Sequence, residues 1–243
     1  MSDVTVISLG GSIVVPDGVD TAFVGEFVAA VRSRLEREPR RRFALIVGGG
    51  ATARRYQQAA RALVPDVGAQ ILDEIGIAAT RVNAQVIRAA FGDLSPDPLV
   101  TDPTCVTCFA GRILVGGGWQ PGFSTDNVSV RLAETLGATT VINLSNIRQI
   151  YTADPKTDPQ AQPLTTITWD ELQRIVGEEW VPGGNTPFDP VATKRAAELG
   201  MTVIAADGRD LANLEALLDG GSFVGTTISA TPAPRQDRPG RSG

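Results

Sequence analysis

The sequence of 243 residues contains no histidine. Histidine is the side chain whose ordinary pKa lies closest to neutral pH, and it is the usual general base of Ser-His-Asp and Cys-His enzymes. Its absence excludes those mechanisms, together with metal sites of the HExxH type. Chemistry in this chain must therefore use carboxylates, arginine or lysine, hydroxyl groups, backbone dipoles or a hard metal ion.

Cysteine is almost as scarce, because the chain has only Cys105 and Cys108, spaced as C-V-T-C. This spacing can indicate a redox pair or a zinc site. A zinc site would need two more ligands, and no further cysteine or histidine is available. The pair also falls in a β-like run, TCVTCFAGRILV, and not at a helix start, where a thiolate would be stabilised. We predict small thiols buried in the core, as is typical of a reducing, cytoplasmic compartment.

Long apolar runs are also missing, since no stretch of 18 or more apolar residues occurs. We therefore expect no membrane span. The N-terminal sequence MSDVTVISLGG resembles no secretory signal, because it lacks a basic segment followed by an apolar one. The net charge of −5 argues against nucleic acid as a partner, because a nucleic-acid surface needs clustered positive charge.

Short β-branched runs alternate with longer segments of helical periodicity. This alternation predicts an α/β fold with a largely parallel sheet that is covered on both faces. Proline and polar residues predict a loop at 150–163, and Thr168 or Asp170 is expected near the cap of a short helix. The strands are expected at 4–9, 43–47, 105–109, 113–115, 139–144, 202–206 and 225–229, and the helices at 21–38, 51–63, 73–91, 126–137, 168–177, 189–200 and 210–220.

Three of the expected strands end in glycine-rich turns: Gly10-Gly11-Ser12, Gly48-Gly49-Gly50 and Gly116-Gly117-Gly118. In an open α/β sheet, ligands bind beyond the carboxyl ends of the strands. Glycine there lets backbone N–H groups approach an anion closely, and the next helix start adds positive potential. The three turns together predict a phosphate site.

A dinucleotide-binding fold is an alternative, because GGGATA at 48–53 fits G-x-G-x-x-A and Asp73 follows about 20 residues later. That fold needs only one such turn and leaves the segment VGGGWQPGFSTDN at 115–127 unexplained. Glycine and proline in this segment favour a loop that folds over a ligand, and Trp119 either covers a ring or packs in the core.

Seven motifs in order resemble the amino acid kinase family, and most closely its UMP kinases of the archaeal type. GIAATRVNA and QPGFSTD are the specific ones, and the resemblance covers about residues 4–228. The others are SLGGS, VGGGATARRY, IYTADPKTDP, FDPVATKRAAELG and GTTI.

The resemblance implies a single domain over 1–229, a three-layer α/β/α sandwich with a largely parallel central sheet. An acceptor-binding lobe would cover about 1–138 and an ATP-binding lobe about 139–229. It further implies a homo-oligomer, usually a hexamer, that transfers the γ-phosphoryl group of ATP to UMP with Mg²⁺. Residues 230–243 have the composition of a disordered tail.

The resemblance also assigns site residues. Arg54 and Asp126 would be catalytic, and the direct metal ligands are not identified. The ATP contacts would come from Gly10, Gly11, Ser12, Gly50, Arg54, Ser145, Asn146, Tyr151 and Asp154. The UMP contacts would come from Gly49, Asp73, Trp119, Gln120, Pro121, Gly122, Phe123, Ser124 and Thr125.

Two positions depart from the family pattern. Ser8 stands where many members carry a lysine, and Arg148-Gln149 stands where the family commonly has Asp-Gly. The second departure affects the expected contacts to adenosine. Two alternatives stay open: another small-molecule kinase of this fold, and a non-catalytic oxoanion store resembling the molybdenum storage proteins. The lack of histidine favours an enzyme over a store.

Overall fold

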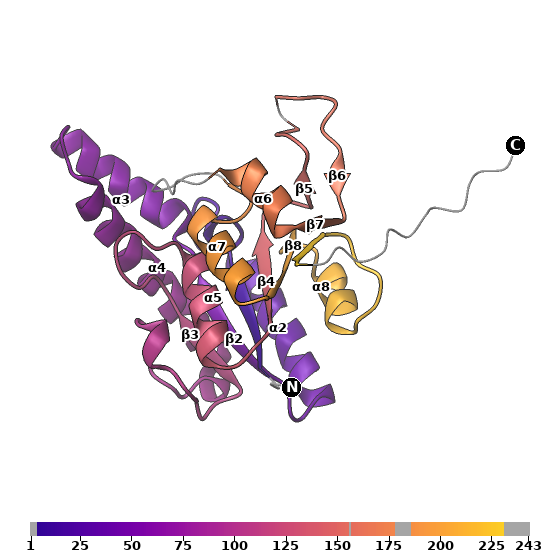
Figure 1. The fold of residues 1–243 in the computed structure, drawn as a ribbon. Coiled ribbons are helices and arrows are strands. Elements are labelled where there is room, and N and C mark those ends of the chain that lie inside the picture. The colour runs from indigo at the N-terminus through magenta and orange to yellow at the C-terminus, as the bar shows by residue number, and fades with distance from the viewer. Residues whose placement is uncertain (1–3, 156, 178–185, 231–243) are drawn as a thin grey trace, which may run out of the picture.

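A seven-stranded sheet forms the centre of the computed structural model, which describes residues 4–155, 157–177 and 186–230 (Figure 1). The strand order is β3-β2-β1-β4-β8-β9-β7. Neighbouring strands are parallel except β8 and β9, which pair antiparallel. The strands of this sheet are β1 (Val4–Leu9), β2 (Arg42–Val47), β3 (Ile113–Gly116), β4 (Thr140–Ser145), β7 (Thr166–Thr168), β8 (Thr202–Asp207) and β9 (Thr226–Ser229).

Helices cover both faces of the sheet, with α5 and α7 in front of it and α2 behind it in Figure 1. One core lies under α2, α4 and α8, and the other lies under α5, α6 and α7. The predicted three-layer α/β/α sandwich is therefore confirmed. The helices are α1 (Gly11–Val14), α2 (Thr21–Arg37), α3 (Gly50–Leu63), α4 (Ala69–Phe91), α5 (Thr125–Thr135), α6 (Trp169–Val176), α7 (Pro190–Glu198) and α8 (Leu211–Leu218), with 3₁₀ turns η1 (Gly92–Leu94) and η2 (Pro103–Cys105).

The central strands are apolar throughout because they bury both of their faces. In β2, Phe43, Leu45 and Val47 point into one core, while Ala44 and Ile46 point into the other. This is the period-two alternation of a strand, filled with apolar residues on both sides. Each core takes residues from before and after position 138, so the two expected lobes share their apolar interior.

The strand expected at 105–109 is wrong, and so is the prediction that its thiols are buried. Only the 3₁₀ turn η2 occurs there, and Cys105 and Cys108 are both exposed. The outer edge of β3 is taken instead by Val100, whose N–H donates to Val115 O at 2.9 Å. Because Val100 already occupies the hydrogen-bonding edge of β3, the cysteine segment cannot pair there and runs over the surface.

Local signals predicted most of the other elements with small shifts, but the short helix α1 and the edge strand β7 were not predicted. Thr168 caps α6 in a capping box with Glu171, as expected. The helix expected from Asp73 begins four residues earlier, at Ala69. The segment 150–163, expected as a loop, carries a short hairpin of β5 (Ile150–Tyr151) and β6 (Pro163–Leu164), which projects from the body in Figure 1.

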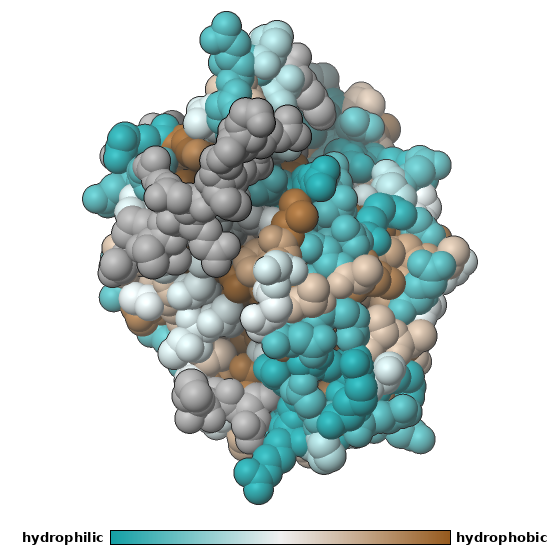
Figure 2. Space-filling view, turned by 90° about the vertical axis from the view of Figure 1, so that its right-hand side faces the viewer, coloured by the Kyte–Doolittle hydropathy of each residue, from teal (hydrophilic) through white to brown (hydrophobic). Residues whose placement is uncertain are grey.

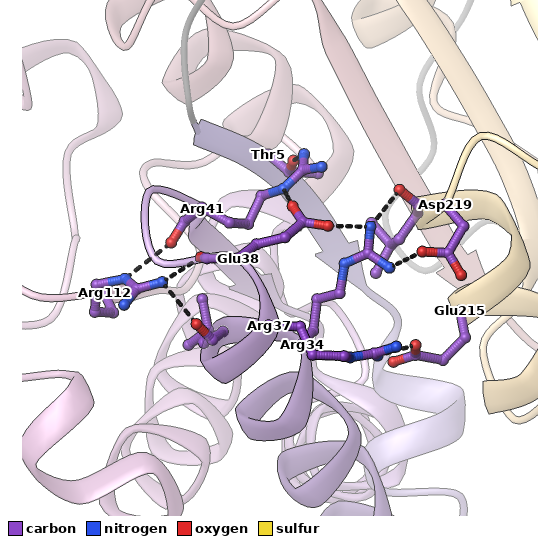
Figure 3. A network of polar contacts seen from close by, with 10 residues as sticks. Thr5, Arg34, Arg37, Glu38, Arg41, Arg112, Glu215 and Asp219 are labelled. Atoms are coloured by element: carbon purple, nitrogen blue, oxygen red, sulfur yellow. Dashed lines mark hydrogen bonds and ion pairs between the residues drawn. The ribbon is translucent and has the colours of Figure 1, made fainter.

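An ionic network joins α2 to α8 at the edge of the sheet where β1 and β2 begin (Figure 3). Arg34 is 3% exposed; it pairs with Asp219 and Glu38 and donates to Leu218 O at 2.7 Å. Arg37 pairs with Glu215 beside it. This edge is opposite to the one that carries the glycine turns.

The predicted tail lies outside the described residues except for Ala230. Within the described ranges, no helix has both the length and the apolar composition that crossing a membrane requires.

Candidate active site

The first two glycine turns lie in direct backbone contact. Gly10 N–H donates to Leu144 O at 2.8 Å, which fixes the first turn to the end of β4. A Cβ atom on Gly11 would lie 2.1 Å from Gly50 N, and one on Gly48 would lie 2.4 Å from Gly11 N. Any larger residue would separate the turns, so the glycines are required by the packing of one turn on the other.

Each of these turns leads into a helix whose N-cap is a glycine. Gly10 precedes α1 and Gly49 precedes α3, and neither has a side chain that could accept from the first N–H groups. The first N–H groups of a helix have no partner inside the helix, and they carry partial positive charge. The junction of the two turns therefore has the chemistry of an anion site.

Helix α4 holds the second and third glycine turns side by side. Asn83, 2% exposed, donates from Nδ2 to Gly48 O and Gly49 O, both at 2.9 Å. Gly118 N–H donates to Thr80 Oγ1 at 2.6 Å. The three turns that the sequence placed at strand ends thus converge on one region. Sequence reasoning missed Thr80 and Asn83, although both lie in the motif GIAATRVNA.

The segment after the third turn is tied to α4 as well. Gly122 N–H donates to Asp73 Oδ2 at 2.9 Å, and Arg81 donates to Gly118 O and Trp119 O at 3.0 and 2.9 Å. Asp73 therefore anchors this loop, and its expected contact with a ribose stays a prediction. Arg81 thus ties the loop to α4 through backbone carbonyls.

Two aromatic rings in this loop stack near a cation. The ring centroids of Trp119 and Phe123 are 5.0 Å apart, and the Arg131 guanidinium lies 5.4 and 5.1 Å from them. Arg131 Nε also donates to Asn127 Oδ1 at 2.8 Å, which fixes the guanidinium on α5. Trp119 thus has a packing role. Ser124 caps α5 by accepting from Asn127 N–H, so Gln120 and Pro121 lie in the loop and Thr125 is the first residue of α5.

Two carboxylates meet beside the first turn. Ser8 donates to Asp126 Oδ1 at 2.9 Å, and Asp189 N–H donates to Asp126 Oδ2 at 3.3 Å. Burial raises the pKa of Asp126 to about 6, and the charge of Asp189 adds to the rise. Two acids close together disfavour ionisation of both. A cation bound between them would favour their ionised forms instead.

Asp189 is a site residue that sequence reasoning did not identify. It is 4% exposed, and burial raises its pKa above the ordinary value. Its Oδ1 accepts from Ala192 N–H at 2.6 Å as the N-cap of α7, while its buried Oδ2 has no hydrogen-bond partner among the described residues. In the sequence, the motif FDPVATK indicates an ordinary helix N-cap, and nothing in it indicates that Asp189 lies beside Asp126.

Arg54 lies on the first turns of α3, exposed, with its guanidinium donating to Pro16 O at 3.3 Å. The neighbouring Arg55 pairs with Asp17. Both arginines therefore contact the segment that joins α1 to α2. The catalytic role expected for Arg54 stays a prediction.

The residues expected to contact adenosine follow β4. Ser145 ends that strand and adjoins the first turn, since a Cβ atom on Gly10 would lie 3.3 Å from Ser145 Cα. Asn146 is exposed, Tyr151 lies on β5, and Asp154 lies in the hairpin turn. At the two positions that differ from the Asp-Gly of the family pattern, Arg148 is exposed, and Gln149 donates to Gly225 O at 3.1 Å.

A cavity of about 450 Å³ lies between α4 and the segment 119–121. It touches three of the residues expected to contact UMP, and none of the glycine triplets lines it. The cavity therefore lies beside the glycine turns and does not lie between them. Its walls are Glu74, Ile77, Ala78, Arg81, Trp119, Gln120 and Pro121.

Comparisons with known proteins agree with this geometry. A model of the amino acid kinase family matches residues 3–207. A protein named uridylate kinase from Methanospirillum hungatei is 40% identical over 92% of this chain and 94% of its own length. Another from Methanoculleus marisnigri is 37% identical over 94% of this chain and 98% of its own. The crystal structure of uridylate kinase from Archaeoglobus fulgidus matches with a TM-score of 0.78 and 30% identity, covering 94% of this chain and 100% of that one.

Proposed function

The chain belongs to the amino acid kinase family, and we propose that it acts as a UMP kinase, which transfers the γ-phosphoryl group of ATP to UMP and gives UDP and ADP. One observation carries the proposal: the turns Gly10–Gly11 and Gly48–Gly50 touch through their backbones beneath two helix starts capped only by glycine. Gly10 N–H and Gly48 N–H already donate to Leu144 O and Leu9 O, so two phosphate chains facing each other would be held by the remaining N–H groups of the turns and helix starts.

Phosphoryl transfer depends on positioning of the substrates and on charge compensation more than on covalent catalysis. The acceptor is already an anionic phosphate, so no general base is needed, in keeping with a chain that lacks histidine. Amides of the two turns and the Arg54 guanidinium would hold the phosphates in line. Such preorganised donors stabilise the charge that spreads over the transferring group.

The two nucleotides would occupy opposite sides of this junction. ATP would lie along Gly10–Ser12, Gly50 and the segment after β4, with its adenosine near Ser145, Asn146, Tyr151 and Asp154. UMP would lie against Gly49 and under the loop 119–125, with Asp73 at its ribose. The acceptor-binding lobe would then be about 1–138 and the ATP-binding lobe about 139–229. The supporting contacts are those that tie the loop 119–125 to α4.

Mg²⁺ fits the carboxylates present. No group of three or more acidic or thiol side chains suited to a metal occurs in the described residues, but Mg²⁺ is commonly held by one or two carboxylates together with substrate phosphates. Asp126 and Asp189 would supply those carboxylates, since Asp189 Oδ2 is buried and unpaired in the described part of the chain. When bound, Mg²⁺ would offset phosphate charge, and it would also offset the repulsion from Asp189 that adds to the effect of burial on the pKa of Asp126.

Self-association, as a hexamer, is part of the proposal. Large apolar side chains are exposed on the outer faces of α3 and α4, which a second copy would cover. On the side of the molecule shown in Figure 2, which is turned away from α3, the lower half is mainly hydrophilic. The exposed residues on and next to α3 and α4 are Tyr56, Leu63, Val64, Ile71, Val82 and Val86.

The remaining assignments follow from the substrates and the charge. We place the enzyme in the cytoplasm, where ATP and UMP are found, with neither nucleic acid nor a membrane as partner. The support is the net charge of −5, which disfavours binding to phosphate polymers and anionic lipid alike.

The test is ADP release measured with UMP, CMP, AMP and small carboxylic acids as acceptors, each with and without Mg²⁺. We expect turnover with UMP and Mg²⁺, and little with the other acceptors. Turnover with another acceptor in place of UMP would make the protein a different kinase of this fold. ATP binding without turnover for every acceptor would favour the oxoanion store.

A further inference from the structure

The surface segment between η2 and β3 carries both cysteines of the chain, Cys105 and Cys108. Both are free and exposed, and both line one surface cavity of about 290 Å³. Their C-x-x-C spacing is the one found in redox-active cysteine pairs. Because they open onto the same hollow, a small thiol-reactive molecule reaches either one.

Asp102 joins these thiols to the loop of the active site. Its carboxylate accepts from Thr104 N–H at 2.9 Å and caps η2, and the Cys105 thiol donates to Oδ2 at 3.7 Å. Hydrogen bonds from the Thr104 side chain and backbone lower the pKa of Asp102, and the side chains of Cys105 and Trp119 contribute in the same direction. Trp119 in turn packs on Phe123.

We propose that Cys105 and Cys108 form a thiol–disulfide exchange site for low-molecular-weight disulfides such as glutathione disulfide. One protein thiolate attacks a sulfur of the small disulfide, forms a mixed disulfide and releases one small thiol, which takes a proton. The second protein thiolate then attacks the protein sulfur of that mixed disulfide. A Cys105–Cys108 bond forms, a second small thiol leaves, and the two electrons lost by the protein reduce the small disulfide.

The disulfide would change the surroundings of Trp119. A bonded sulfur has no S–H to donate, so Asp102 loses the contact from Cys105. The new ring also pulls on η2, whose first residue is bonded to α5 through Pro103 O and Thr135 Oγ1 at 3.0 Å. We expect oxidation to alter the surroundings of Trp119 through the contacts of Asp102 and through η2. This expectation does not rest on the proposed kinase activity.

The test uses the full chain, reduced and then exposed to glutathione disulfide, with free thiols counted by a chromogenic reagent and masses recorded without reductant. We expect both thiols to be lost and the mass to fall by two hydrogens, with no attached glutathione. In each single variant, Cys105→Ser or Cys108→Ser, the reaction should stop at the mixed disulfide between the remaining cysteine and glutathione. Persistence of the dithiol, or disulfides only between chains, would overturn the proposal.

A second measurement follows the link to the active-site loop. Tryptophan emission should differ between oxidised and reduced protein, and Trp119→Phe should lose most of this difference. The double variant Cys105→Ser/Cys108→Ser should show no response to glutathione disulfide. An emission difference unaltered in Trp119→Phe would overturn the link through Asp102. These readouts need no nucleotide, so they are independent of the test for UMP kinase activity.

Discussion

The Ser8 hydroxyl donates to Asp126 Oδ1 across 2.9 Å, although 118 positions separate the two residues. Ser8 lies near the end of β1, and Asp126 lies in the first turn of α5. The position at which many family members carry a lysine is therefore used here to orient the carboxylate that we propose for the metal. In the proposed function, charge compensation at the phosphates would come from backbone amides, Arg54 and Mg²⁺.

Asp126→Asn should abolish most of the activity without unfolding the protein. The amide keeps the shape and can accept from Ser8, but it removes the negative charge that would hold Mg²⁺. We expect kcat to fall by about 100-fold or more. ADP release and a thermal melt measure the two effects, and the exposed Asp66→Asn is the control. Activity close to that of the control would remove Asp126 from the site.

The stability of the unliganded protein should depend on pH through the same carboxyl group. Its pKa rises from 3.8 to about 6 in the folded state, so across this range Asp126 binds more protons in the folded chain than in the unfolded chain. The free energy of unfolding should therefore fall as pH rises from 3.8 to about 6. Urea unfolding with a chelator present should show a weaker dependence in Asp126→Asn. Equal slopes in the two proteins would contradict the assignment.

Arg54→Ala should lower activity while the fold is kept. The side chain is exposed and its hydrogen bond to Pro16 O is long at 3.3 Å, so we expect little stability to depend on it. Removing a charged donor from the phosphates should lower kcat/KM at least about tenfold. Arg55→Ala, which removes only the surface pair with Asp17, is the matched control. Kinetics unchanged in Arg54→Ala would exclude this arginine from catalysis.

Gly11→Ala should damage both stability and activity. The added Cβ would lie 2.1 Å from Gly50 N, so the two glycine turns would have to move apart. Overpacking of this kind typically costs about 1–3 kcal/mol. Gly18→Ala is the control, because a Cβ there meets nothing within 4 Å. If both variants bound ATP equally well, the two turns would not form one site.

The ionic network between α2 and α8 should stabilise the fold through Arg34. Arg34→Met leaves the Leu218 carbonyl and two carboxylates without a buried partner, and we expect a loss of about 2 kcal/mol. Arg37→Met, which breaks the more exposed pair with Glu215, should cost much less. Chemical denaturation compares the two. An equal loss in both variants would show that burial of Arg34 adds nothing.

Much of the fold could be predicted because its signals are local. Apolar runs such as FALIV, followed by glycine and then by a helical period, indicate a strand, a turn and a helix from neighbouring residues alone. Parallel strands bring their carboxyl ends to one edge, so the convergence of the glycine turns followed as well. Gly137, with φ +66°, ends α5 as a local glycine signal predicts.

Contacts between distant residues could not be read in this way. Sequence spacing gave no sign that Asp189 would lie beside Asp126, or that Thr80 and Asn83 would hold two glycine turns. The cysteine segment has strand-like residues, but Val100 occupies the ladder position next to β3, so Cys105 and Cys108 lie on the surface. The sequence by itself determined the layers and the glycine edge, because periodicity and turn chemistry act over a few residues. Only the tertiary structure decided which carboxylates meet and which thiols are exposed, because those outcomes depend on which distant segments compete for the same space.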